Sequence, residues 1–397
     1  MTDNTTGIKE SAILVQPLSP IIVRDGRSFG TGERMHSLDW IYPSVFVGAL
    51  RTLVGKQKGW DFDTKEQIDL LKQIAVTGPF PCVGKTPYFP KPLDCVVGEE
   101  KGQHTAYFCR PQKLGDGEGT DAPNGLWPVM PNVEEDFKPE TTAGFWSMDS
   151  MIGWLFNTKD QLPQSDFKAI SPKPDQNDAI ALPQKDNRVH VAIDSKTGLA
   201  RDTMFFSTSG IDLTLDKSAI DAVNFYAQVK FNDTESSQLD TLHPLGGERR
   251  LARWVVSHES KLWESMKKRL AECPFHENHV RMILATPAIF KDGWKPGWLK
   301  PSSDGHLEGS PPGCDDLTLQ LVGTSIGRWM PISGWCYEKG EPKAVRRMVP
   351  AGSVYFFTLQ DEGGKTDHLR DQYWLQSVCD CEQDRRDGFG AALWGIW

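Results

Sequence analysis

Three short segments of this sequence combine arginine with glycine, residue types suited to binding a phosphate-bearing chain. In residues 24–27 (RDGR), two guanidinium groups flank a tight turn and could contact phosphates. Residues 246–250 (GGERR) could present consecutive backbone N–H groups to an anion, provided that Glu248 pairs with a neighbouring arginine or caps a helix. Residues 385–390 (RRDGFG) contain glycines that let a backbone approach a sugar-phosphate chain without a Cβ clash.

Each segment also has an ordinary structural interpretation, because short motifs have low specificity. The first could be a surface turn in which Asp25 pairs locally with an arginine. The second could be a loop-to-helix junction, and the third could be a turn before the buried strand that the terminal AALWGIW requires. Arg51, on a predicted helix, could be either a ligand contact or a solvated side chain.

Residue types for catalysis or metal binding are sparse. A metal-independent ribonuclease needs a base and an acid within hydrogen-bond reach, and His36 and His243 are the candidates. Lone histidines are more often structural, so ribonuclease activity is the less favoured of the two interpretations of these residues. The clusters at residues 273–279 (CPFHENH) and 379–381 (CDC) have no paired Cys-x-x-Cys partner, so no zinc site is expected. The sequence has no Walker A, H-E-x-x-H or G-x-S-x-G motif.

Composition limits the class of protein. The chain has 397 residues and a net charge of −9, and an acidic total argues against a nucleic-acid partner unless basic residues gather locally. No run of roughly 20 apolar residues would span a bilayer, and the polar start lacks a basic-then-apolar signal pattern. Eight cysteines are too few for a disulfide scaffold in a chain of this length. We therefore expect a cytoplasmic protein with no cofactor and no membrane partner.

The elements that must position these residues alternate irregularly between strands and helices. The run at residues 11–26 predicts a strand that ends in a turn, and Pro43 predicts a helix start with Ser44 as its cap. After a polar insertion at about 157–188, residues 189–207 alternate around a Lys-Thr-Gly turn and predict a β-hairpin. A later helix is predicted at about 257–271. Without regular βαβ spacing, this order favours two α+β units over a doubly wound sheet.

Several segments follow one another along the chain in a recognisable order: PLSPIIVRDGRSFG, PSVFVGALRT, HVAIDSKTGLARDTMFF, LGGERR, ATPAIFKDGW, ISGW with PKAVRRMVPAGSVYFF, and GFGAALWGIW. Together they resemble the Cmr subunit three family, the Cas5-like RAMP-superfamily subunit of type III-B (Cmr) CRISPR complexes. Each motif alone is weak, but together they cover both ends and the middle of the chain. The family often has Pro where Ser28 stands, and the insertion is long, but neither departure touches the matching segments.

The resemblance implies an α+β fold with two ferredoxin-like (RRM-like) domains of the RAMP superfamily, long insertions and an extended β-hairpin. The first domain would cover residues 8–215, with the insertion and the hairpin, and the second would cover residues 216–397, with the glycine-rich loop. The resemblance also implies no nuclease activity. The alternative is cleavage of precursor crRNA, which related RAMP proteins perform without a metal. The chain would grip the 5′ repeat-derived tag of the guide RNA (crRNA) in antiviral, RNA-guided defence.

The implied partners are the large polymerase-like Cmr subunit, a neighbouring Cmr backbone RAMP subunit, and target RNA near the 5′ end of the guide. A purely protein-bridging scaffold is a further alternative. Its interface anchors would be a helix containing Trp254, Leu262 and Met266, and the Gly-Trp pairs at 293–294 and 297–298. The candidate RNA-binding residues come from the arginine–glycine segments, the first helix and the hairpin tip. They are Arg24, Arg27, Arg51, Lys196, Arg201, Gly246, Gly247, Arg249, Arg250, Arg385, Arg386, Gly388 and Gly390.

Overall fold

Contacts within the chain divide it into two compact units that are interleaved along the sequence. The computed structural model describes residues 9–25, 37–100, 103–131, 139, 144–157, 161–163, 179–213, 223–231, 239–257, 261–273, 275, 278–336, 339–360 and 366–397. Unit 1 comprises residues 1–75, 182–257 and 331–346, and unit 2 comprises residues 76–181, 258–330 and 347–397. The units are interleaved because strands distant in sequence pair with one another. The predicted division into domains at residues 215–216 stays a prediction.

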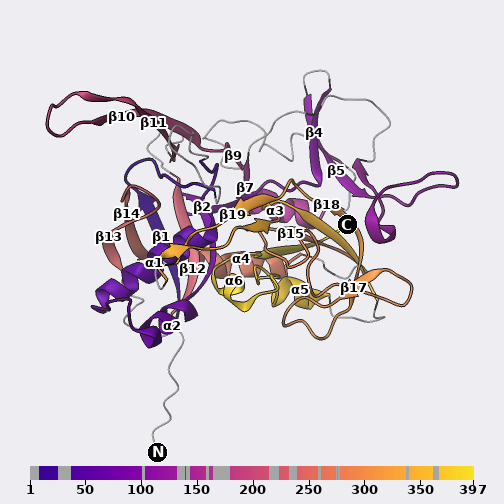
Figure 1. The fold of residues 1–397 in the computed structure, drawn as a ribbon. Coiled ribbons are helices and arrows are strands. Elements are labelled where there is room, and N and C mark those ends of the chain that lie inside the picture. Colours follow the sequence, from indigo (N-terminus) through magenta and orange to yellow (C-terminus); the bar gives the residue numbers. More distant parts are fainter. Residues whose placement is uncertain are drawn as a thin grey trace, which may run out of the picture. The chain divides into compact units, whose positions relative to one another are not determined.

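Four antiparallel strands form a sheet in unit 1. In order across the sheet they are β13 (Asp240–Pro244), β14 (Leu251–Ser257), β1 (Lys9–Pro17) and β12 (Asn224–Phe231) (Figure 1). The register places Val15 opposite Trp254 and Ile13 opposite Ala227, and all four side chains are buried. β1 ends at Pro17, so the strand predicted over residues 11–26 is interrupted, and residues 21–25 make separate contacts described below.

Two helices complete the described core of unit 1. α1 (Pro43–Gln57) buries Phe46, whose ring centroid lies 5.1 Å from that of Trp254 in the sheet. α2 (Lys65–Gln73) follows it along the chain. The helix start predicted at Pro43 is confirmed, but Ser44 is not the cap: the N-cap residue is Tyr42, and no side chain caps the helix. A proline in the first turn removes an N–H that would otherwise need a partner, which reduces the need for a capping side chain.

The predicted β-hairpin is confirmed and is longer than the sequence indicated. β10 (Gln184–Ile193) and β11 (Ala200–Asp212) pair antiparallel, with Val191 opposite Phe205. The pairing register of the two strands shifts between Val191 and Ile193. Of the insertion predicted at about 157–188, residues 158–160 and 164–178 lie outside the described residues. Unit 1 also contains the short pair β20 (Trp335–Cys336) and β21 (Glu341–Pro342).

Unit 2 is built around a six-stranded antiparallel sheet whose central strands are almost wholly buried. Strands buried on both faces have continuous apolar runs, as in VYFFTL and ALWGI. In order the strands are β16 (Lys300–Pro301), β17 (Leu307–Gly309), β18 (Leu319–Ser325), β23 (Val354–Leu359), β15 (His279–Leu284) and β24 (Ala392–Ile396).

Smaller sheets and helices surround this sheet in unit 2. One run of strands is β2 (Ala75–Val83), β3 (Thr86–Pro90), β7 (Phe145–Ser147) and β9 (Ala179–Ile180). A second sheet contains β4 (Cys95–Glu100), β5 (Gln103–Pro111), β6 (Val129–Pro131) and β8 (Gln161–Pro163). The helices are η1 (Pro123–Gly125), α3 (Met148–Leu155), α4 (Lys261–Ala271), α5 (Asp367–Asp371) and α6 (Glu382–Arg386). A two-stranded pair, β19 (Met330–Ile332) and β22 (Arg346–Met348), lies at the two ends of the 331–346 segment, which belongs to unit 1.

A buried ion pair links three elements in the core of unit 2. The Arg281 guanidinium in β15 contacts the Asp94 carboxylate, and neither side chain is exposed. The Trp154 indole N–H of α3 donates to the other Asp94 oxygen at 2.9 Å, and the Arg281 guanidinium also donates to the Trp154 carbonyl. The rings of Phe108 and Trp154 stack with centroids 3.5 Å apart beside this group. The buried charge is paired with an opposite charge, although the Arg281 Nε–H has no hydrogen-bond partner among the described residues.

The α+β class predicted from the sequence is confirmed, because the strands pair almost entirely antiparallel and the helices are separate elements. The finer prediction of two ferredoxin-like domains stays a prediction. In the described part of the chain, no helix combines the length and apolarity needed to cross a membrane. All eight cysteines are free thiols.

Candidate nucleic-acid interface

The short segment Ile21–Asp25 joins three of the regions that the sequence singled out. Ile21 pairs with Ile211 at the base of the hairpin, through N–H···O contacts of 3.0 and 2.7 Å. The Gly247 N–H of the glycine loop donates to the Ile22 carbonyl at 2.7 Å. Arg24, whose side chain is exposed, lies two residues further along this same segment. The structure therefore brings the first arginine segment, the GGERR loop and the hairpin base together within unit 1.

The GGERR loop is a tight connection between β13 and β14. The Leu245 N–H donates to the Arg250 carbonyl at 2.8 Å and closes the loop. Gly246 has φ +80°, and a Cβ there would lie 2.6 Å from the Ile22 carbonyl oxygen, so only glycine fits. The loop is thus pressed against the Ile21–Asp25 segment. It joins two strands, which corrects the prediction that it leads into a helix.

The loop does not offer the run of free N–H groups that the sequence suggested. The Gly247 N–H is used by Ile22, and the glycines serve close packing rather than anion binding. Glu248 pairs with Arg250 at 3.0 Å, one of the two roles expected for it, and this pair partly neutralises Arg250. Arg249 differs: it is exposed, and its side chain has no hydrogen bond or ion pair with the residues that the structure describes.

Glu248 and Arg249 adopt an uncommon backbone conformation. Their φ angles are +54° and +51°, in the left-handed region that residues with a Cβ rarely occupy. Each such residue costs on the order of 1 kcal/mol, and strain of this kind gathers at functional sites. The strained turn directs the unpaired Arg249 side chain into solvent beside the Ile21–Asp25 segment.

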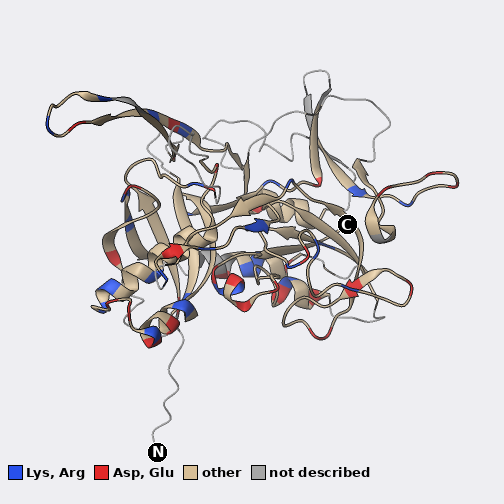
Figure 2. Ribbon diagram, in the orientation of Figure 1, with Lys and Arg blue, Asp and Glu red and all other residues tan. Residues whose placement is uncertain are grey.

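The hairpin tip carries basic residues that are locally compensated. Arg201 lies 3.6 Å from the Asp194 carboxylate, while Lys196 is exposed. The backbone N–H groups of Thr197 and Lys196 donate to Asp194 at 3.0 and 2.9 Å, and these bonds hold the pKa of Asp194 below its ordinary value. Acidic and basic residues alternate along the hairpin and along the helices (Figure 2). The tip is therefore a well-ordered turn with little net positive charge.

The hairpin exposes an apolar stripe that the sequence analysis did not assign to a site. Val189 is 77% exposed and Phe205 is 69% exposed, and Val191 lies directly opposite Phe205. Alternating apolar residues on a hairpin normally predict a face that packs against a core. Only the tertiary structure shows that this face lacks such a cover within the described residues. The stripe consists of Val189, Val191, Ile193, Leu199 and Phe205.

The C-terminal glycine loop lies in the core of unit 2, contrary to its predicted place at the ligand surface. Gly388 and Gly390 are buried. The Gly390 N–H donates to the Pro287 carbonyl at 2.8 Å, and the Gly388 carbonyl accepts from the Thr286 hydroxyl at 2.8 Å. A Cβ at Gly390 would lie 2.6 Å from the Cys379 sulfur, so packing alone requires glycine there. Of the two interpretations of residues 385–390, the structure agrees with a turn that precedes a buried strand.

The basic residues next to that loop are also engaged within the protein. Arg385 donates to the carbonyls of Cys379 and Asp380 at 2.9 and 3.3 Å, and Arg386 pairs with Glu382. Arg51 is engaged in the same way, because it donates to the Lys72 and Ile74 carbonyls. These arginines hold elements together, and we leave them out of the interface. Arg27 lies outside the described residues.

The histidines proposed for cleavage do not form a visible acid–base pair. His243 is 6% exposed, and its ring packs edge-on against Trp254. Burial, together with the nearby Lys56 charge, lowers the pKa of His243 to about 4. A neutral, buried imidazole is poorly placed to exchange protons with a bound RNA. His36 lies outside the described residues.

The structure also shows where the candidate metal ligands and the candidate interface residues lie. No group of three or more His, Cys, Asp or Glu side chains among the described residues could hold a metal ion; His276 lies outside them. Trp254 and Met266 are fully buried, which corrects their suggested role as interface anchors, and Trp254 belongs to β14 rather than to a helix. Sequence periodicity cannot distinguish a buried anchor from an exposed one, because both are apolar.

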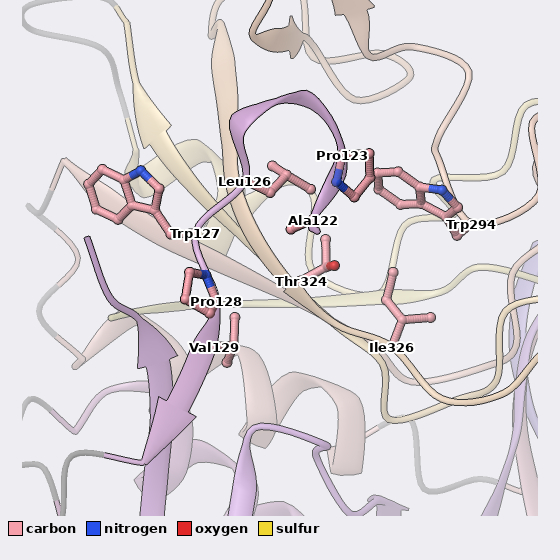
Figure 3. A pocket seen from close by; sticks show the side chains of 9 residues that line it. All are labelled: Ala122, Pro123, Leu126, Trp127, Pro128, Val129, Trp294, Thr324 and Ile326. Atoms are coloured by element: carbon pink, nitrogen blue, oxygen red, sulfur yellow. The ribbon is translucent and has the colours of Figure 1, made fainter. Parts of the chain in front are cut away.

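One pocket of about 300 Å³ lies in unit 2, between the η1 segment and β18 (Figure 3). Its walls are prolines, aliphatic side chains and the indoles of Trp127 and Trp294, with Thr324 as the polar side chain. It contains no ionisable group, so it could not perform acid–base chemistry or hold a phosphate by charge. The charged surface of unit 1 is therefore the stronger candidate site.

Comparison with known proteins identifies the family. Residues 13–397 match the family described as CRISPR-associated protein (Cas_Cmr3). The chain belongs to the Cmr3 family. This match covers nearly the whole chain and confirms the resemblance that the ordered motifs indicated. A search of curated proteins found no match.

Solved structures show distant similarity to this Cmr3-family chain. A chain of the type III-B Cmr-β complex bound to cognate target RNA and AMPPnP is 14% identical, with a TM-score of 0.48, and the match covers 87% of this chain and 86% of that one. The Cmr-β complex bound to cognate target RNA gives 13% identity, a TM-score of 0.46 and the same coverage. A chain of the Csm3–Csm4 subcomplex of a type III-A interference complex is 12% identical, with a TM-score of 0.38, over 89% of this chain and 94% of that one.

Proposed function

We propose that this chain is a non-catalytic subunit of a type III-B Cmr complex that grips the 5′ repeat-derived tag of the guide RNA. Membership of the Cmr3 family places it among CRISPR-associated proteins. The observation that carries the proposal is the junction in unit 1, where Gly247 bonds to Ile22 and the exposed Arg24 and Arg249 come from two neighbouring segments. Two guanidinium groups on rigidly joined segments suit adjacent phosphates of a single strand.

The same proposal includes the partners expected from the sequence. The large polymerase-like subunit and a neighbouring backbone RAMP subunit would complete the site, because an acidic chain is expected to bind RNA weakly by itself. The apolar stripe of the hairpin would meet target RNA near the 5′ end of the guide. Inserting apolar side chains between bases costs a few kcal/mol per unstacked step, and contacts along the hairpin would offset that cost.

Guide loading tests the assignment directly. The complex is reconstituted with Arg249→Ala in this chain, and guide RNA content and affinity are measured against salt concentration. Loss of one charge-assisted contact is expected to weaken binding about tenfold, and the slope of log K against log[salt] should become shallower by about 0.7. Arg253→Ala is the matched control, since Arg253 is also exposed but already bonded to Asp240 at 3.1 Å.

Two results would overturn this proposal. If the Arg249→Ala complex matches the wild type in guide content and in salt dependence, the GGERR loop is not part of the RNA-binding site. Specific cleavage of repeat RNA by the purified chain in EDTA, lost in His36→Ala or His243→Ala, would replace the non-catalytic function with a nuclease.

A further inference from the structure

The arginines of this chain differ in whether the protein already uses their charge. Most of those that the structure describes hold a carboxylate or a carbonyl. Three exposed arginines have no hydrogen bond or ion pair within the described residues: Arg249, Arg328 and Arg347. Arg249 belongs to the site proposed above, whereas the other two belong to unit 2 and have no assigned role. The engaged ones include Arg188, Arg201, Arg250, Arg253, Arg269, Arg281, Arg370, Arg385 and Arg386.

The two unassigned arginines flank an exposed indole. Trp329 follows Arg328 in the chain and is 49% exposed, although an indole of this size is normally mostly buried. The Arg347 guanidinium carbon lies 4.7 Å from the centroid of the Trp329 ring, in a cation–π contact. We call Arg328, Trp329 and Arg347 the Trp329 platform. It presents an exposed indole together with two exposed arginines that have no ion pair among the described residues.

The backbone on both sides of the platform is held firmly by unit 2. A Cβ at Gly327 would lie 2.7 Å from the Pro350 ring, so this segment lies directly on Pro350. Met348, the residue after Arg347, is fully buried. Val349 then exchanges two backbone hydrogen bonds with Ala288, at 2.9 and 2.8 Å. A platform held in this way loses little conformational entropy when a ligand binds.

We propose that the Trp329 platform binds a single-stranded extension of the target RNA outside the guide–target duplex. One base would stack on the indole, and its flanking phosphates would contact the two arginines. The ligand class follows from the pattern. A base needs a flat aromatic surface and its phosphates need cations, and single-strand binding proteins combine these two features without reading sequence. Bases in a duplex are not free to stack on a side chain. A protein partner would have to supply carboxylates to both arginines and remains an outcome of the test.

This inference extends the proposed function, since it concerns a second contact with RNA in the same complex. The test uses the reconstituted complex, guide RNA included, and two fluorescein-labelled target RNAs. One target ends with the duplex, and the other carries an unpaired extension at each end. Trp329→Ala is expected to weaken binding of the extended target about tenfold, with Trp329→Phe intermediate, because stacking depends on the ring. Binding of the short target should not change.

The arginines are tested by their salt dependence. Arg328→Gln with Arg347→Gln should make the slope of log K against log[salt] shallower by about 1.4 for the extended target, as expected for two contacts on a single strand. Arg188→Gln with Arg253→Gln is the matched control, because it removes the same charge from exposed arginines that are already paired with Asp186 and Asp240.

The outcomes separate this inference from the proposed function. Unchanged affinity of the Trp329→Ala complex for the extended target would overturn the inference and leave guide loading intact. An equal change of slope in the control would also overturn it, since general charge would then explain the effect. If the Trp329→Ala chain assembles into the complex less efficiently, but the assembled fraction binds the extended target normally, the platform contacts a protein partner instead. A wild-type complex that loads no guide would contradict the proposed function instead.

Discussion

At the scale of single residues, the environment decides which charged groups are available. Arg249 and Arg250 are neighbours in sequence, yet Arg250 pairs with Glu248 and Arg249 remains exposed and unpaired among the described residues. Arg385 and Arg386 form a similar pair in sequence, but both are engaged within unit 2. An arginine count along the chain therefore overstates the number of groups that could contact a phosphate.

His243 leads to a prediction about pH and stability. Its folded pKa of about 4 lies below the ordinary value of 6.5, so the unfolded chain binds more protons between these two values. The stability that follows from the neutral imidazole is present above about pH 6.5 and is lost as the pH falls toward 4, by about 1–3 kcal/mol. Chemical unfolding of the chain at a series of pH values should show this decrease.

The control for that measurement is His243→Phe, which preserves the contact with Trp254 but cannot titrate. Its stability should fall less steeply between pH 6.5 and 4 than that of the wild type. Parallel pH dependence of the two proteins would mean that other groups cause the loss.

At the scale of elements, the hairpin combines a well-formed turn with an exposed apolar stripe. Asp194 organises the turn by accepting backbone N–H groups, so the hairpin does not need the stripe in order to form its tip. Val191 and Phe205 are cross-strand neighbours and both are exposed, which is costly for a surface that meets only water.

We expect Val191→Ser with Phe205→Ser to leave the stability of the chain nearly unchanged. Binding of a fully complementary target to the guide-loaded complex should weaken about threefold to thirtyfold, because apolar contact with bases is lost. Thermal unfolding and target affinity are the two measurements. Leu242→Ser, at a site on β13 that is 55% exposed, is the control and should alter neither. A large drop in melting temperature would show instead that the stripe packs against protein.

At the scale of the whole molecule, segments far apart in sequence must meet before either unit can form. Unit 1 pairs β1 with strands more than 200 residues away, and unit 2 joins Asp94 to Arg281 across 187 residues. The Asp94–Arg281 pair connects β15 with the start of β4 and with Trp154 of α3. Substituting the residues of this pair therefore tests how far the core of unit 2 depends on one long-range contact.

Arg281→Met is expected to destabilise the chain by about 3–5 kcal/mol, because it leaves the Asp94 carboxylate buried without its counter-ion. Arg281→Met combined with Asp94→Leu should be less destabilising than Arg281→Met alone, since no uncompensated charge remains. Urea unfolding of the two variants and the wild type gives both values. A double variant less stable than the single one would show that the ion pair itself, rather than the relief of a buried charge, stabilises the core.

The sequence by itself determined the local elements and the family. The hairpin, the first helix, α4 and the α+β class follow from periodicity and turn residues, which act over a few residues, and the ordered motifs indicated the Cmr3 family. Tertiary structure alone decided the rest. The interleaving of the units, the burial of Gly388 and Gly390, and the cation–π contact of Arg347 with Trp329 all depend on contacts between distant segments. Such contacts have no local signal, because a glycine or an arginine has the same sequence neighbours whether it lies in the core or on the surface.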